Sequence, residues 1–368
     1  MERFLAIEAA SGIVLMGAAA AALLWANSPW REAYARVHDL HFWINEGLMT
    51  LFFFVVGLEI RLEMHSGELN SVRRAALPLA GALGGMLVPA LIFLVLNVGR
   101  ESAAGWAVPM ATDIAFAVGA LALLGSRIPA GVRVFLLAIA VIDDIGAIVV
   151  IALFYSGELV PAGFVVLASG IAAIFVMQLI GFRSAVAYVI PALITWAGAY
   201  HAGIHPALAG VIVGLMTPVK EVSGLQDALE RWVAFGIIPL FAFANAGVSL
   251  GQIGFRGDGA WAFWGIFLGL TAGKPIGILG FSWLAARLEV VTPPRIGWNQ
   301  MALAGLTGGI GFTMSLFIAQ LAFPGDHLLE TAKFAIVCGS AVSGLLSIAT
   351  GYTIPMGGFS KGADRQES

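Results

Sequence analysis

The chain has 368 residues, of which 60% are hydrophobic and only 11% are charged, and its mean hydropathy is +0.93. Soluble domains carry about 25% charged residues, so this composition excludes a soluble globular protein and indicates an all-α polytopic membrane protein. The formal net charge of −3 gives no indication of nucleic-acid binding, and the single cysteine, Cys338, excludes a disulfide within the chain.

Apolar stretches recur along the chain, and polar, Pro-rich or Gly-rich segments separate them. They predict about twelve transmembrane helices, since each crossing needs about 20 apolar residues. We expect residues 1–360 to form a single transmembrane domain and residues 361–368 a short, disordered cytoplasmic tail. The expected helices lie near residues 9–27, 41–62, 76–97, 105–124, 131–155, 161–180, 184–200, 205–217, 228–250, 260–286, 299–322 and 331–353.

Lysine and arginine residues are distributed unevenly between alternate connecting segments. If the N-terminus is cytoplasmic, thirteen of the 19 fall inside and five outside, while Lys274 lies within an apolar segment. Cytoplasmic segments are enriched in these residues, so we expect both termini inside the cell.

The expected helix at 105–124 is interrupted by Pro109, which cannot complete the helical hydrogen-bond ladder. Backbone freed at membrane depth survives only where it lines protein or a cavity. Asp113 follows this break, where its carboxylate would compensate the positive end of the next half-helix. Thr112 adds a hydroxyl that could bind a small cation. The alternative is an ordinary proline kink with Asp113 as its cap.

Asp143 and Asp144 interrupt the apolar helix expected at 131–155. An ionised carboxylate at the bilayer centre costs at least ~2.5–3.5 kcal/mol, so the pair must face protein or water and take a proton or a cation. Successive helical residues project about 100° apart, so one helix face cannot hold both equally. A pair that serves packing alone is the alternative.

Lys274 also lies inside an apolar segment and is followed by Pro275. A lysine at that depth needs a carboxylate partner, and either Asp143 or Asp113 would serve.

A second interruption, Gly308, Gly309 and Gly311, falls in the helix expected at 299–322. Paired interruptions in the two halves of a chain are typical of transporters built from inverted repeats, with the binding site at the membrane midplane. A glycine-lined packing face is the alternative.

Weaker signals lie elsewhere. Glu59 and Glu63 lie one turn apart where the second expected helix meets the cytoplasm, so they mark either a solvated helix end or a proton-sensing entrance. Glu46 lies near the opposite membrane interface. His205 is a lone histidine at the start of an expected helix, where a structural role is more common than a functional one. Asn245 is expected to join helices rather than to bind an ion.

Together these motifs resemble the NhaA family of sodium/proton antiporters. The matching stretches are Ala111-Thr-Asp-Ile-Ala-Phe-Ala117, Leu123-Leu-Gly-Ser-Arg127, Ala140-Val-Ile-Asp-Asp-Ile-Gly-Ala147, Pro239-Leu-Phe-Ala-Phe-Ala-Asn-Ala-Gly-Val-Ser249, Gly273-Lys-Pro275 and Gly309-Ile-Gly-Phe-Thr-Met-Ser315.

The resemblance implies that the fourth and eleventh helices are broken and cross at midplane. It implies a homodimer in the bacterial inner membrane that is not an enzyme and holds no cofactor. Such a protein exports Na⁺ or Li⁺ in electrogenic exchange for a larger number of protons, and is active at alkaline pH.

Carried over by position, Asp143 and Asp144 form the cation and proton site, Thr112 and Asp113 line it, and Lys274 pairs with Asp143. In the same way, Glu59 and Glu63 match acidic positions associated with pH response, and His205 matches a histidine of the eighth helix. Arg61-Leu62 replaces a basic pair at the cytoplasmic mouth, and Glu46 replaces an expected aspartate.

Two other functions compete. A sodium-coupled solute symporter of related fold needs a cavity large enough for an organic solute. No intramembrane arginine is available to hold an anionic solute. An intramembrane aspartyl protease needs aspartates on two helices and a Gly-x-Gly-Asp motif, which this sequence lacks.

Overall fold

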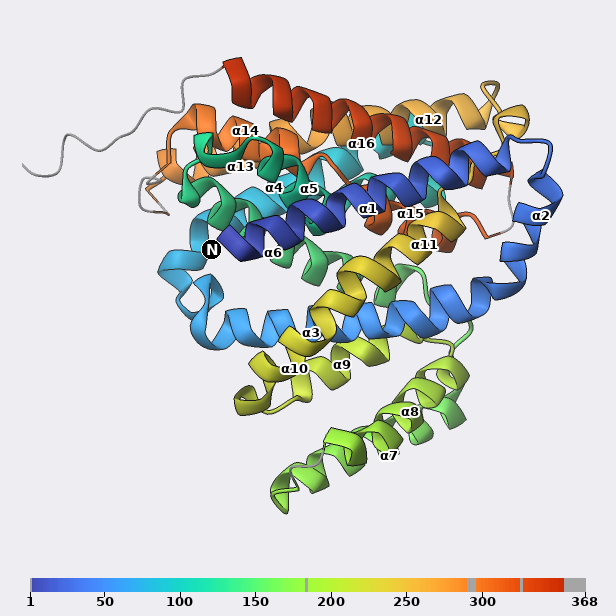
Figure 1. The fold of residues 1–368 in the computed structure, drawn as a ribbon, viewed down its shortest axis with the longest axis vertical. Helices are drawn as coiled ribbons and strands as arrows, with labels where there is room; N and C mark the ends of the chain where they lie inside the picture. The colour runs from blue at the N-terminus through green and yellow to red at the C-terminus, as the bar shows by residue number, and fades with distance from the viewer. Residues whose placement is uncertain (1, 183–184, 290, 292–295, 325–326, 354–368) are drawn as a thin grey trace, which may run out of the picture. The chain divides into compact units, whose positions relative to one another are not determined.

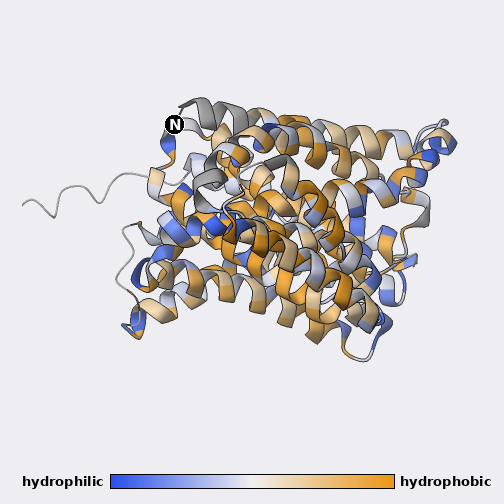
Figure 2. Ribbon diagram, turned by 90° about the horizontal axis from the view of Figure 1, so that it is seen from below, coloured by the Kyte–Doolittle hydropathy of each residue, from blue (hydrophilic) through white to orange (hydrophobic). Residues whose placement is uncertain are grey.

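The computed structural model describes residues 2–182, 185–289, 291, 296–324 and 327–353. These residues form helices joined by short connections, with no strand in the described ranges (Figure 1). Hydrophobic residues cover the lengths of the helices, and hydrophilic residues gather at helix ends and connections (Figure 2). The all-α class is confirmed for the described part, and the predicted tail at 361–368 lies outside it.

Helices occupy every predicted segment. Judged by length and composition, five described helices can cross a membrane, or up to seven if each of two bent pairs counts as one span. Two shorter apolar helices, Ala10–Ala26 and Ala207–Met216, accompany them. The count of twelve crossings therefore stays a prediction.

The described helices divide between two compact units. The first unit holds residues up to Ile13, Ser71–Asp143, and those from Leu250 onward; the second holds Val14–Asn70 and Asp144–Ser249. Two helices, α1 (Glu2–Ala26) and α6 (Ala130–Phe154), contribute residues to both units.

The first unit contains the bent helix pairs. Besides parts of α1 and α6, its helices are α4 (Val72–Asn97), η4 (Glu101–Gly105), η5 (Val108–Met110), α5 (Ile114–Leu123), η6 (Gly125–Arg127), η8 (Leu250–Gln252), α12 (Asp258–Leu268), η9 (Gly269–Gly273), α13 (Lys274–Arg287), α14 (Trp298–Gly308), α15 (Phe312–Ala322) and α16 (His327–Thr353). Helices α4 and α13 pack closely because Gly84 and Gly277 face each other, and a Cβ on either would collide with the other's carbonyl oxygen.

The second unit contains a cavity that several of its helices line. Its helices are α2 (Arg31–Ala35), η1 (Arg36–Leu40), η2 (Trp43–Leu48), α3 (Met49–Ser66), η3 (Glu68–Asn70), α7 (Pro161–Leu179), α8 (Ala185–Ala202), α9 (Ala207–Met216), α10 (Val219–Trp232), η7 (Val233–Ile237) and α11 (Ile238–Asn245). Helix α3 packs against α9, and α7 lies along α8 (Figure 1).

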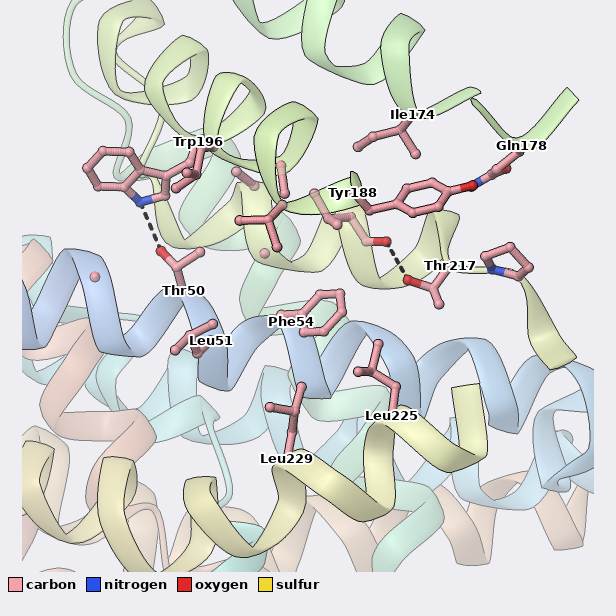
Figure 3. A pocket seen from close by; sticks show the side chains of 18 of the residues that line it. Thr50, Leu51, Phe54, Ile174, Gln178, Tyr188, Trp196, Thr217, Leu225 and Leu229 are labelled. Atoms are coloured by element: carbon pink, nitrogen blue, oxygen red, sulfur yellow. Dashed lines mark hydrogen bonds between the residues drawn. The ribbon is translucent and has the colours of Figure 1, made fainter. Parts of the chain in front are cut away.

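The cavity measures about 650 Å³ and lies between α3, α7, α8, α9 and α10 (Figure 3). Its lining is mainly apolar, and its polar side chains bond within the unit. Trp196 Nε1 donates to Thr50 Oγ1 at 3.1 Å, and Gln178 donates to the carbonyl of Met216 at 2.5 Å. All of its lining residues belong to the second unit.

Candidate functional site

The site is built where two helices of the first unit are interrupted. Residues 111–113 leave the helical conformation between η5 and α5, and the two segments bend by 49°. Residues 309–311 separate α14 from α15 in the same way, with a bend of 45°. Both interruptions predicted from proline and glycine positions are present.

The two interruptions contact each other. Asp113 N donates to the carbonyl of Ile310 at 2.7 Å, and Thr112 Oγ1 donates to the carbonyl of Gly308 at 3.0 Å. The first break thus supplies donors for two carbonyl groups at the second break.

Asp113 caps both half-helices that begin at the breaks. Its Oδ1 accepts from Phe116 N in α5 at 2.9 Å, and its Oδ2 accepts from Thr313 N in α15 at 2.9 Å and from Thr313 Oγ1 at 2.5 Å. One buried carboxylate therefore compensates two positive helix ends. The capping role, which the sequence offered as the alternative, is present on two helices at once.

Lys274 pairs with Asp143, one of the two partners that its sequence position allowed. Lys274 Nζ lies 2.5 Å from Asp143 Oδ2 and donates to Thr112 Oγ1 at 2.6 Å. Thr112 Oγ1 lies 2.8 Å from the same Asp143 oxygen, and all three side chains are buried. A hydroxyl has one proton to donate, so Thr112 serves either Asp143 or Gly308 at a time.

Local backbone geometry places Lys274 at the end of the π-helical turn η9. Pro275 has no N–H to donate to the carbonyl four residues earlier, and the chain takes the wider turn just before it. The side chain of Lys274 is fully buried inside the protein.

Asp143 retains one oxygen that could accept a further ligand. Its Oδ1 is buried and has no hydrogen-bond partner among the described residues, while Oδ2 is held by Lys274 and Thr112. Asp144 follows on the same helix and is also buried. The arrangement leaves carboxylate oxygen available beside a fixed positive charge.

The three glycines lie where the second break begins and ends. Gly308 closes α14, Gly309 caps it, and Gly311 precedes α15. A Cβ on Gly309 would lie 2.5 Å from the carbonyl oxygen of Leu270, and one on Gly311 would lie 2.9 Å from the carbonyl oxygen of Ala111. These two positions require glycine because backbone approaches so closely.

The residues expected to respond to pH belong to the second unit. Glu59 and Glu63 lie one turn apart on α3 and are partly exposed. His205 Nε2 lies 3.3 Å from Glu46 Oε1, a pairing that the sequence did not indicate. Asn245 donates to Asn45 Oδ1 at 3.0 Å, which agrees with its expected role in joining helices.

Sequence reasoning missed the serines of α16. Ser340 Oγ accepts from Phe312 N at 3.1 Å, and the Ser347 hydroxyl lies 2.6 Å from that of Thr307. Serines at 340, 343 and 347 recur at helical spacing, which is the signal that could have identified this face.

Comparisons with known proteins identify the family to which the chain belongs. A family model described as Na⁺/H⁺ antiporter 1 matches residues 2–350. A protein of Sorangium cellulosum (strain So ce56) named Na(+)/H(+) antiporter NhaA 2 is 47% identical, over 96% of this chain and 90% of its own length.

Two further relatives carry the name Na(+)/H(+) antiporter NhaA. The one from Janthinobacterium sp. (strain Marseille) is 47% identical over 96% of this chain and 92% of its own length. The one from Cupriavidus necator (strain ATCC 17699) is 44% identical over 97% of this chain and 90% of its own length. The resemblance to the NhaA family is confirmed, and the chain belongs to the Na⁺/H⁺ antiporter 1 family.

Proposed function

We propose that this protein exchanges Na⁺ for H⁺ across the membrane, with Asp143 and Asp144 as the groups that bind both ions. The observation that carries the proposal is the buried Asp143, which has one oxygen held by Lys274 and the other without a hydrogen-bond partner among the described residues. The names of the relatives support the choice of ions.

Oxygen ligands suit the proposed cation. Na⁺ and Li⁺ are hard ions, and hard ions prefer carboxylate, hydroxyl and carbonyl oxygen. Asp143 and Asp144 offer carboxylates, Thr112 a hydroxyl, and Gly308 the carbonyl that Thr112 contacts. Because Lys274 and Thr112 already hold Asp143 Oδ2, an entering cation first meets the free oxygen of Asp143 and then competes with the ammonium.

Exchange of Na⁺ for H⁺ follows because an ionised carboxylate without a partner is costly where water is excluded. A buried carboxylate that is not neutralised by a partner must take up a proton or a cation, so the two ions compete for the same oxygens. Asp143 and Asp144 are adjacent, so an ion bound by one carboxylate changes the charge that the other faces. Antiport requires that the site change the side it faces only in a proton-loaded or cation-loaded state, and the bent pairs around it are the elements we expect to move.

Further properties belong to the same proposal. We infer Li⁺ transport, entry of more protons than cations leave, and activation at alkaline pH, with Glu59, Glu63 and His205 contributing to the pH response. The membrane potential would then drive export at about 2.3 kcal/mol per charge per 100 mV. The distribution of basic residues favours both termini in the cytoplasm. The resemblance to the family supports a homodimer in the bacterial inner membrane.

Everted membrane vesicles with a pH-sensitive dye test the proposal. Addition of Na⁺ or Li⁺ alone should dissipate the pH gradient, and Asp144→Asn should abolish this response. Asp258→Asn is the matched control, because Asp258 forms a partly exposed ion pair with Arg100 at 3.3 Å. Undiminished exchange in Asp144→Asn would remove the site assignment, and a response that needs an added organic solute would favour a symporter.

A further inference from the structure

One face of α16 carries three buried serines that reach toward the broken segments. Ser340, Ser343 and Ser347 are each 1% exposed or less. Their spacing of three and four residues places them on one side of the helix. Helix α16 packs against α14 and α15 within the first unit (Figure 1).

The serines bond to both sides of the second break. Ser347 pairs with Thr307 in α14 at 2.6 Å, and Ser340 accepts from Phe312 N, at the start of α15, at 3.1 Å. Ser343 Oγ lies 3.5 Å from the carbonyl of Leu270, at the limit of hydrogen bonding. Of the three serines, Ser340 contacts the helix end that Asp113 also caps.

Ser340 satisfies a backbone group that has no other helical partner. Phe312 is the first residue of α15, where N–H groups lack acceptors inside the helix. The next N–H, that of Thr313, donates to Asp113 at 2.9 Å. Two successive N–H groups of one helix end are thus held by two different elements, α16 and the residue that caps α5.

The contacts continue from this helix end to the ion pair. Asp113 also receives the hydroxyl of Thr313 and donates its own N–H to Ile310. The preceding residue, Thr112, contacts both Lys274 and Asp143. A shift of the start of α15 therefore displaces Asp113 and, through the backbone, the hydroxyl that lies against the ion pair.

We propose that Ser340 is a positioning residue for the ion-binding site, with its hydroxyl oxygen fixing the start of α15 and hence Asp113 and Thr112. It does not contact the transported ion. This inference rests on the proposed exchange function and concerns how tightly the site holds Na⁺. Loss of the acceptor leaves a buried N–H unsatisfied, which favours displacement of the helix end.

The test compares Ser340→Ala, Ser340→Thr and a control. Ser282→Ala is the control because Ser282 is a fully buried serine of the same unit whose hydroxyl has no partner among the described residues. Vesicle assays give the Na⁺ concentration for half-maximal response and the maximal rate per folded protein. Thermal unfolding in detergent reports stability separately.

We expect Ser340→Ala to raise the half-maximal Na⁺ concentration about fivefold, the factor that one lost hydrogen bond represents, with little change in maximal rate. Ser340→Thr keeps the acceptor and should restore the wild-type value, and Ser282→Ala should leave it unchanged. If Ser340→Ala yields no folded protein, Ser340→Cys, similar in size but a weak acceptor, takes its place with the same expectation.

Two results overturn the inference. One is an unchanged half-maximal Na⁺ concentration in Ser340→Ala, or in its cysteine replacement, including the case where only the amount of folded protein falls. The other is a failure of Ser340→Thr to restore it. If instead the unmodified protein gives no response to Na⁺, the proposed function fails, whereas a normal response with unaffected Ser340 variants removes the positioning role alone.

Discussion

Lys274 and Asp143 show at the scale of single residues why the site must be kept intact. Both side chains are fully buried, and their charges lie 2.5 Å apart. Removal of both charges also removes the desolvation cost of both, whereas removal of one leaves the other without compensation in a medium of low dielectric constant. Asp113 differs, because its two oxygens already accept from backbone and hydroxyl donors.

The difference between removing one charge of the Lys274–Asp143 pair and removing both predicts the stability of charge variants. Lys274→Met should destabilise the protein by about 3–5 kcal/mol, because Asp143 would stay buried beside Thr112 without its ammonium partner. The double variant Lys274→Met, Asp143→Leu should recover much of that loss. Melting temperatures of the purified variants in detergent provide the comparison. A double variant that melts below the Lys274→Met single variant would contradict the prediction.

Broken helices are the elements that position these residues. Pro109 and the glycines at 308–311 marked both interruptions in the sequence, since each type weakens helical geometry in a known way. Which group satisfies the freed backbone was not visible in the sequence. The structure answers this with contacts between residues about 200 positions apart, such as Asp113 with Thr313.

The backbone of the second break lies so close to neighbouring segments that a side chain added there should destabilise the protein. Gly309→Ala places a Cβ 2.5 Å from the carbonyl of Leu270 and 2.7 Å from Ser343 Oγ, so the break must shift. We expect a lower melting temperature and weaker Na⁺ exchange.

Gly280→Ala is the matched control for this element. Gly280 lies in α13, and a Cβ added there would meet no atom within 4 Å, so alanine should be neutral or stabilising by up to ~1 kcal/mol. Equal melting temperatures for Gly309→Ala and Gly280→Ala would show that the break tolerates a side chain.

At the scale of the whole molecule, the distribution of basic residues predicts how the chain enters the membrane. The segment near Asn70 is expected inside, and the segment near Glu158 outside. Both residues are exposed at helix connections, so a probe can reach them.

Cysteine labelling measures this orientation. Cys338 is the only cysteine, so Cys338→Ser gives a background into which Asn70→Cys or Glu158→Cys is introduced. A membrane-impermeant maleimide should label Glu158→Cys in intact cells and Asn70→Cys only in everted vesicles. The opposite pattern would place both termini outside.

The sequence alone determined the all-α class, the two interruptions, and the intramembrane residues that need partners: Asp113, Asp143, Asp144 and Lys274. It could do so because a charge or a freed peptide group is costly in hydrocarbon, and an apolar run of about 20 residues around such a group is visible in the sequence. The residues left either Asp143 or Asp113 as the partner of Lys274, and the tertiary structure shows that it is Asp143, as the resemblance implied. Only the tertiary structure shows that Asp113 caps two helices and that Ser340 accepts from Phe312 N at the start of α15. Those contacts join segments distant in the chain, and a periodic pattern such as that of the α16 serines marks a helix face without saying which residues that face meets.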